Sequence, residues 1–210
     1  SLPFSLTEGQ QSAIDDIELD LMNKRAMNRL VQGDVGCGKT VVAETAIFHA
    51  VSAGWQAAFM APTEILSRQH FARISVDLAK FGMKTALLVS GLKAAERREI
   101  LEGISSGDID IIVGTHALIQ SDVEFAKLGL VITDEQHRFG VNQRKILSEK
   151  SEAVNVLVMS ATPIPRTLAA TVFGDMDFSV IKSKPSNRKD IITRYATEKS
   201  RERVYANVYN

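Results

Sequence analysis

Cysteine is nearly absent from the chain, and so are several other features that define classes of protein. The 210 residues include a single cysteine, Cys37, which excludes an internal disulfide and fits a reducing cytoplasm. No apolar run approaches the roughly 20 residues that span a bilayer. The first residues also lack the basic start and apolar stretch of a signal peptide. We therefore expect a cytoplasmic protein without a membrane partner.

Neither a metal-binding cluster nor a basic excess stands out in the sequence. The four histidines have no cysteine or second histidine close by, which disfavours a zinc site. Lysine plus arginine and aspartate plus glutamate number 25 each, so the formal net charge is zero. Nucleic-acid binders usually carry a basic excess, because phosphate contacts dominate their affinity. Evidence for a polynucleotide partner must therefore come from local motifs.

The chain does show a regular alternation of two kinds of segment. Short runs rich in Val, Ile, Leu and Ala are typical of parallel strands covered on both faces. Between them lie amphipathic stretches such as Val41–Ala53 and Glu64–Phe81, the second with Ile65, Phe71, Ile74 and Leu78 near helical spacing. The runs are Asn28–Gln32, Gln56–Ala61, Lys84–Val89, Asp110–Val113, Leu128–Thr133, Asn155–Ser160 and Phe178–Ile181. The alternation predicts an α/β fold with a mostly parallel sheet between helices.

A glycine-rich motif follows the first apolar run and matches the P-loop of nucleotide-binding proteins. Its residues are Gly33, Asp34, Val35, Gly36, Cys37, Gly38, Lys39 and Thr40. A strand before it and a helix beginning at Lys39 are the context that the mechanism needs, since loop amides and a helix N-terminus then face an anion. We expect Lys39 to neutralise β- and γ-phosphate charge and Thr40 to ligate magnesium. For Cys37, a small residue that fills the loop is favoured over a reactive thiol.

An acidic pair ends a later strand and predicts the second half of the same site. The apolar run Leu128–Thr133 leads into Asp134-Glu135. Downstream of a P-loop, Asp134 is expected to hold magnesium, and Glu135 to orient and deprotonate the attacking water. On its own, such a pair is usually only a solvated strand end.

Further motifs narrow the class of NTPase. In order and spacing they resemble superfamily 2 helicases: Ala61-Pro62-Thr63-Glu64, Gly114-Thr115-His116, Asp134-Glu135-Gln136-His137 and Ser160-Ala161-Thr162-Pro163. Upstream, Phe4 and Leu6-Thr7-Glu8-Gly9-Gln10 resemble the adenine-reading Q motif. A simple nucleotide-dependent switch, the alternative of a different class, has no need of strand-contacting motifs.

Three longer stretches resemble the RecG family of DNA branch-migration helicases, and the resemblance covers about residues 2 to 195. They are Asp134–Val141, Gly114–Gln120 and Ala161–Thr167. Transcription–repair coupling factors are similar but usually carry Glu-Gln at Gln136-His137, so RecG is favoured and the coupling translocase stays the alternative. The departures are small: Cys37 replaces the family's serine, and Val89-Ser90-Gly91 its Leu-Thr-Gly.

The resemblance implies a role for each motif residue. Gln10 would bind the adenine edge with Phe4 nearby, although Thr7 also makes this segment a good helix start. Thr63 and Thr115 would contact strand phosphates, or only cap helices, and Arg68 and Arg138 are further candidates for phosphate contacts. Ser160 and Thr162 would couple nucleotide state to DNA grip, with His137 hydrogen-bonded to them or simply interior. Trp55 is expected to pack rather than to stack on bases.

The resemblance also implies a domain division and partners. Residues 1–182 would form a three-layer, RecA-like P-loop NTPase domain, the first motor domain. Residues 183–210 would be a linker, marked by Pro185-Ser186-Asn187, and the truncated start of a second motor domain. The family's wedge domain, which grips branched DNA, and its second RecA-like domain, which supplies arginine fingers, are not in this sequence. With ATP and Mg²⁺ as cofactors, we expect the chain to bind ATP but to unwind DNA poorly.

Overall fold

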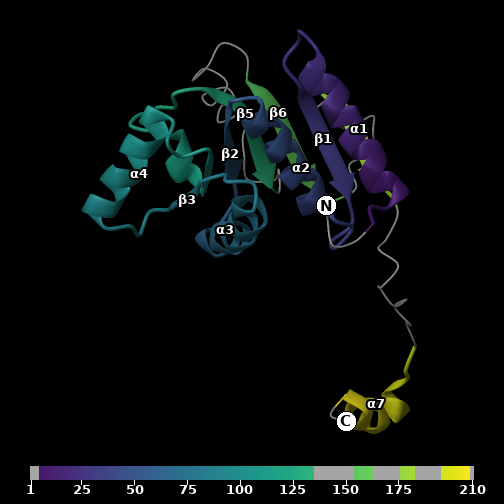
Figure 1. Ribbon diagram of the computed structural model, residues 1–210. Coiled ribbons are helices and arrows are strands. Elements are labelled where there is room, and N and C mark those ends of the chain that lie inside the picture. The colour runs from purple at the N-terminus through teal and green to yellow at the C-terminus, as the bar shows by residue number, and fades with distance from the viewer. Residues whose placement is uncertain (1–4, 135–153, 163–175, 183–194, 209–210) are drawn as a thin grey trace.

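The computed structural model describes residues 5–134, 154–162, 176–182 and 195–208, and its centre is one parallel sheet (Figure 1). The strands are β1 (Asn28–Gly33), β2 (Gln56–Met60), β3 (Thr85–Leu88), β4 (Ile111–Gly114), β5 (Leu128–Asp134), β6 (Asn155–Ser160) and β7 (Asp177–Ile181). Their order across the sheet is β3-β4-β2-β5-β6-β1-β7, and every pairing is parallel. All seven predicted strands are confirmed, each end within one residue.

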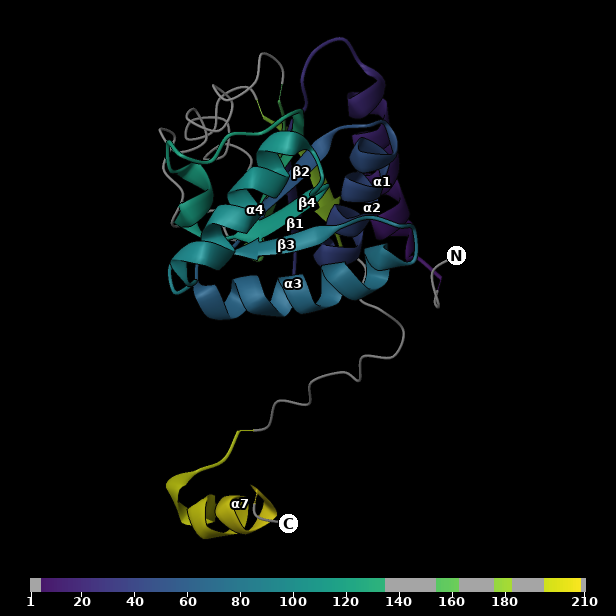
Figure 2. The same ribbon diagram turned by 60° about the vertical axis from the view of Figure 1, so that its left-hand side comes forward.

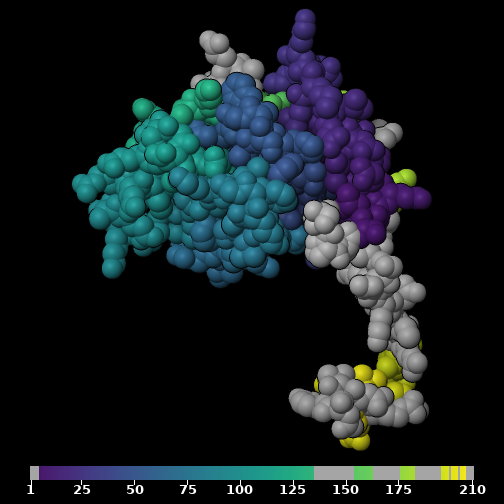
Figure 3. All heavy atoms as spheres, viewed as in Figure 1, coloured from purple at the N-terminus to yellow at the C-terminus, as the bar shows by residue number. Residues whose placement is uncertain are grey.

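Helices cover both faces of the sheet (Figures 1 and 2). On the sheet lie α1 (Glu8–Met22), α2 (Lys39–Ser52), α3 (Glu64–Ala79), α4 (Ala94–Ser106) and the 3-10 turn η1 (His116–Ile119). The described residues also form the 3-10 turn η3 (Glu198–Ser200) and the helix α7 (Arg201–Val208). Helices α1, α2 and α3 pack on one face, and α4 with η1 on the other. The space-filling view shows α1 and α3 closing over the first face (Figure 3). The predicted three-layer α/β architecture is confirmed.

Alternating side chains of each strand supply the two cores. Phe59 and Ile132 join the core under α1–α3, whereas Ala58 and Val131 face the α4 side, and all four are at most 1% exposed. Burial of one large apolar side chain stabilises the fold by about 1.5–3 kcal/mol. Because both faces are covered, these strands read as continuous apolar runs in the sequence.

Helix α1 is fixed at both ends by polar contacts. The Thr7 side chain accepts a hydrogen bond from the backbone N–H of Gln10, and the Gln10 side chain accepts one from the backbone N–H of Thr7. This reciprocal pair is a capping box. Farther along, Arg29 of β1 lies 2.6 Å from Asp20 and 3.4 Å from Asp16. Burial disfavours the charged guanidinium, but the hydrogen bond and charge of Asp20, together with the charges of Asp16 and Asp177, outweigh it and raise the pKa of Arg29.

Two predicted helices differ from the structure in detail. Helix α3 ends at Ala79 rather than Phe81, and the chain turns at Gly82, whose φ is +77°. Its predicted apolar stripe is partly wrong, because Ile65 is 80% exposed and Ser67 is buried instead. Helix α2 ends at Ser52 rather than Ala53. Helix α7 begins at Arg201 and lies apart from the sheet (Figure 1). In the described parts of the chain, no helix has the length and apolar character to cross a bilayer.

Candidate functional site

The parallel register brings the motif segments to one edge of the sheet. Gln32 of β1 pairs with Ser160 of β6, and Met159 of β6 pairs with Asp134 of β5. Strands about 4.8 Å apart place the ends of β1 and β5 roughly 10 Å from each other. The P-loop and Asp134 therefore lie roughly 10 Å apart at the carboxyl edge, the edge where α/β sheets bind ligands.

The glycines of the P-loop are required by the local geometry. Gly36 and Gly38 have φ of +78° and +93°, a region that residues with a Cβ rarely adopt. A Cβ at Gly38 would also collide with the side-chain amide of Gln10, and one at Gly33 would lie 2.5 Å from Cys37 Sγ. The loop backbone therefore lies close to α1 at Gly38 and close to the Cys37 side chain at Gly33.

Lys39 places a positive charge over the loop at the start of α2. Its Nζ donates to the carbonyl oxygens of Gly33 at 2.6 Å and Asp34 at 3.1 Å. The Cys37 amide donates to Asp34 O at 3.1 Å, and Val35 at the tip is 71% exposed. The first amides of a helix have no partner within it, so this end favours an anion.

Cys37 points into the protein. Its side chain is 1% exposed and belongs to the core under α1 and α2. A buried thiol among apolar groups behaves as a small hydrophobic residue. The burial of Cys37 in this core favours a small residue that fills the loop over a reactive thiol.

Gln10 joins α1 to the P-loop. The side chain is 4% exposed, its Nε2 donates to Cys37 O at 2.7 Å, and its Oε1 accepts from Thr7 N at 2.9 Å. An amide has two N–H donors and two acceptor lone pairs, so one of each is left for another group such as a purine edge. Phe4, the other adenine candidate, lies outside the described residues.

Asp134 ends β5 with its carboxylate at this edge, 16% exposed. Its Oδ2 lies 2.8 Å from Nε2 of His70 on α3, a contact that none of the sequence motifs indicates. The only sequence signal was spacing, because His70 falls on the same helical face as Ser67 and Ile74. Glu135, Gln136, His137 and Arg138 lie outside the described residues.

The proposed DNA-contacting residues lie after β2 and β4 at the same edge. Thr63 caps α3 by accepting from Leu66 N at 3.3 Å, so the capping role is confirmed. Arg68 pairs on the surface with Glu64, at 2.8 Å. Thr115 follows β4 and is the N-cap of η1 without a side-chain cap bond.

Ser160 is the last residue of β6, Thr162 follows the strand, and the two side chains contact each other. Their hydroxyl oxygens lie 3.0 Å apart, and the Thr162 amide donates to Ser160 Oγ at 3.3 Å. Ser160 is buried at the end of its strand, next to β1. The pair forms a small polar turn between the P-loop strand and the strand of Asp134.

A buried acid connects α2 to α3 beside this edge. Glu44 is 7% exposed, and its Oε2 accepts from Arg73 Nη2 at 3.1 Å. Arg73 Nε lies 2.7 Å from Oε1, close enough for an ion pair but not aligned as a hydrogen bond. Burial raises the pKa of Glu44, and the charge and hydrogen bond of Arg73 oppose that rise.

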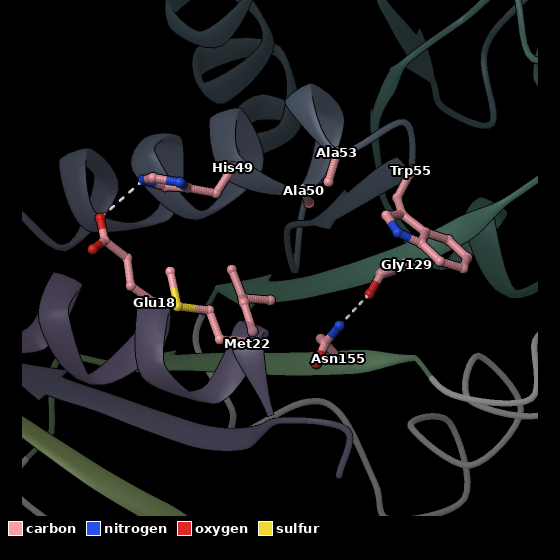
Figure 4. A pocket seen from close by; sticks show the side chains of 9 residues that line it. Glu18, Met22, His49, Ala50, Ala53, Trp55, Gly129 and Asn155 are labelled. Atoms are coloured by element: carbon pink, nitrogen blue, oxygen red, sulfur yellow. Dashed lines mark hydrogen bonds and ion pairs between the residues drawn. The ribbon is translucent and has the colours of Figure 1, made fainter. Parts of the chain in front are cut away.

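A pocket of about 250 Å³ lies at the opposite, amino edge of the sheet (Figure 4). His49 Nε2 lies 3.0 Å from Glu18 Oε1 on one side of it, and Asn155 donates to Gly129 O on the other. Trp55 packs on Gly129, as expected of a packing residue. The described residues that line the pocket include no part of the P-loop and no acid at the carboxyl end of a strand.

Together the fold and the carboxyl edge define a RecA-like P-loop NTPase domain. The sequence model of DEAD/DEAH box helicases matches residues 7–171. The chain belongs to the DEAD/DEAH box helicase family, whose members use ATP.

Within that family the chain is similar to RecG proteins. It is 58% identical over 195 residues to the ATP-dependent DNA helicase RecG of Streptococcus pneumoniae, covering 93% of this chain and 29% of that protein. For RecG of Bacillus subtilis the identity is 52% over 206 residues, covering 98% and 30%. A solved structure of RecG bound to a three-way DNA junction matches with a TM-score of 0.87 and 46% identity, over 99% of this chain and 28% of that chain. The chain thus spans less than a third of the relatives that it matches.

Proposed function

We propose that the chain is the first motor domain of an ATP-dependent helicase that acts on branched DNA in the bacterial cytoplasm. Residues 1–182 form the motor domain, and residues 183–210 are a linker and the start of a second one. The observation that carries the proposal is the meeting of P-loop, Asp134, Thr63, Thr115 and the Ser160–Thr162 turn at one edge. The RecG names of the relatives favour branched DNA over a transcription–repair translocase.

The P-loop residues hold the triphosphate. Lys39 exchanges its carbonyl partners for β- and γ-phosphate oxygens, and the loop amides from Gly33 to Gly38 donate to the phosphates. Gln10, already braced on Cys37 O, presents its remaining N–H and lone pair to adenine, with Phe4 nearby. Asp34, Val35 and Gly36 form the outer turn.

The two acids act on the γ-phosphate side of the site. The Thr40 hydroxyl and the Asp134 carboxylate are hard oxygen donors on α2 and β5, and such donors suit Mg²⁺. When bound, magnesium neutralises charge that develops on the phosphates. Glu135 orients the attacking water and accepts its proton.

The remaining residues connect this chemistry to DNA. Thr63, Thr115, Arg68 and Arg138 contact the phosphates of one strand, which fixes position without reading sequence. His137 senses the γ-phosphate and hydrogen-bonds the Ser160–Thr162 turn. The turn joins the strands of the P-loop and of Asp134, so a shift in one strand reaches the other.

The test uses the full-length protein, with ATP hydrolysis measured on three-way junctions and on linear duplex of equal length. Branched DNA is expected to stimulate hydrolysis more than duplex. Glu135→Gln should keep binding of an ATP analogue but lower kcat by about 10²–10⁴-fold, because the proton acceptor is lost. Lys39→Ala should instead weaken analogue binding. Retained turnover in Glu135→Gln, or equal stimulation by both DNAs, contradicts the proposal.

A further inference from the structure

His70 and Asp134 form a nearly buried pair at the carboxyl edge of the sheet. The Nε2 atom of His70 lies 2.8 Å from Oδ2 of Asp134, and the two side chains are 12% and 16% exposed. The residues come from different layers, since His70 is on α3 and Asp134 ends β5. An ionised carboxylate is only an acceptor, so Nε2 carries the hydrogen and donates it to Oδ2.

The imidazole ring is held in place by packing. Its centroid lies 4.5 Å from that of Phe59, with the planes tilted by 43°. Phe59 is fully buried on β2, the neighbour of β5, where it pairs with Ile132. The ring therefore packs on β2, next to the strand that ends in Asp134. Because the imidazole is fixed by this packing, its hydrogen bond also fixes the orientation of the Asp134 carboxylate.

We infer that His70 is a positioning residue for Asp134, an inference that rests on the proposed function. The hydrogen bond to Oδ2 restricts rotation of the carboxylate, so that Asp134 would be held in one orientation to bind the magnesium that accompanies ATP. Metal-ligating carboxylates are commonly hydrogen-bonded in this way, and loss of such a partner lowers metal affinity or activity by about 10- to 100-fold. His70 acts through Asp134 and does not itself touch the metal.

The chain offers a matched control on the other side of the domain. His49 of α2 lies 3.0 Å from Glu18, so it makes the same kind of histidine–carboxylate contact. That pair lines the pocket at the amino edge, away from the P-loop (Figure 4). If the loss of any histidine–carboxylate pair weakened Mg²⁺-dependent nucleotide binding, substitution of either histidine would do so. If His70 acts by positioning Asp134, only the substitution of His70 has this effect.

The experiment titrates Mg²⁺ into full-length protein holding a fluorescent, non-hydrolysable ATP analogue and measures analogue affinity. His70→Ala should move the Mg²⁺ midpoint about 10- to 100-fold upward. Analogue affinity in EDTA should stay unchanged, which shows that the variant is folded around the P-loop. His70→Gln, whose Nε2 reaches a similar position, should recover most of the shift. His49→Ala should match the wild type.

The possible results separate the two proposals. A midpoint within twofold of wild type in His70→Ala, an equal shift in His49→Ala, or no recovery in His70→Gln overturns the positioning role. In these cases the proposed function still stands on wild-type behaviour. If the wild-type protein shows no Mg²⁺-dependent analogue binding, the ATP site and the inference both fall.

Discussion

Gly38 is the most constrained single residue of the candidate site, and Gly54 is its natural control. Both have φ near +90°, yet a Cβ at Gly54 meets nothing within 4 Å, whereas one at Gly38 collides with the Gln10 amide. Gly54→Ala should cost about 1–2 kcal/mol of stability from backbone strain alone. Gly38→Ala should cost more and also weaken binding of an ATP analogue at least tenfold, because Gln10 and the loop must separate.

Urea unfolding and analogue titration measure the two effects for both variants. The steric argument fails if Gly38→Ala and Gly54→Ala lose equal stability and both bind nucleotide normally. Either substitution acts on a glycine with a positive φ, so a difference between them reports on the contact with Gln10.

Glu44 gives a prediction about pH at the same scale. A folded-state pKa above the ordinary 4.5 means that the folded protein holds the proton more tightly than the unfolded chain does. The contribution of Glu44 to the free energy of unfolding is therefore complete below its unfolded-state pKa and is lost as the pH rises through its folded-state pKa. The difference in unfolding free energy between wild type and Glu44→Gln should fall from pH 4 towards neutral pH and then level off. Urea denaturation at several pH values measures it, and a difference constant with pH would contradict the burial argument.

At the scale of elements, the strands were predictable and some of the helix surfaces were not. Strands buried on both faces leave continuous apolar runs, which is why β5 and β6 were located to the residue at their starts. Helix α4 has one fully buried residue, Ile104, among charged neighbours, so its pattern gave little signal. Ile65 fits the helical spacing of α3, but its side chain points to solvent. The spacing of apolar residues alone does not reveal which side of a helix packs on the sheet.

The attachment of α1 to the sheet leads to a prediction at this scale. Replacing Arg29 with methionine leaves Asp20 and Asp16 without their cation beside β1. Removing one partner of a mostly buried ion pair costs about 3 kcal/mol. The exposed pair of Arg98 and Glu102, 3.9 Å apart, is the control, and Arg98→Met should stay within about 0.5 kcal/mol of wild type. Urea denaturation compares them, and equal losses would show that α1 is not anchored by Arg29.

At the scale of the whole molecule, sheet order decides which motifs meet. The sequence predicted each strand but not the order β2-β5-β6-β1, which brings His70 to Asp134 across 64 positions. Contacts between residues far apart in the sequence depend on which strands are neighbours in the sheet. The apolar pattern within one segment contains no information about that order. The P-loop and acidic strand end were predictable because their chemistry is local; the hydrogen bonds that orient Gln10 and Asp134 were not.

The location of the site within the chain predicts how activity divides between this domain and the rest of the protein. Lys39, Thr40 and Asp134 all lie at one edge of one sheet, so the 210-residue chain should bind an ATP analogue within about tenfold of the full-length affinity. The resemblance to RecG proteins implies that the arginine completing the transition state belongs to the second motor domain, and such a residue contributes about 10³–10⁵ in rate. The chain should therefore hydrolyse ATP at least about 10³-fold more slowly than the full-length protein on a three-way junction, with no stimulation by DNA. Circular dichroism establishes that the chain is folded, and single-turnover hydrolysis measures the rate. If a folded chain hydrolysed ATP at the full-length rate, all the groups that stabilise the transition state would have to lie within these residues, and the division of the motor between two domains would be wrong.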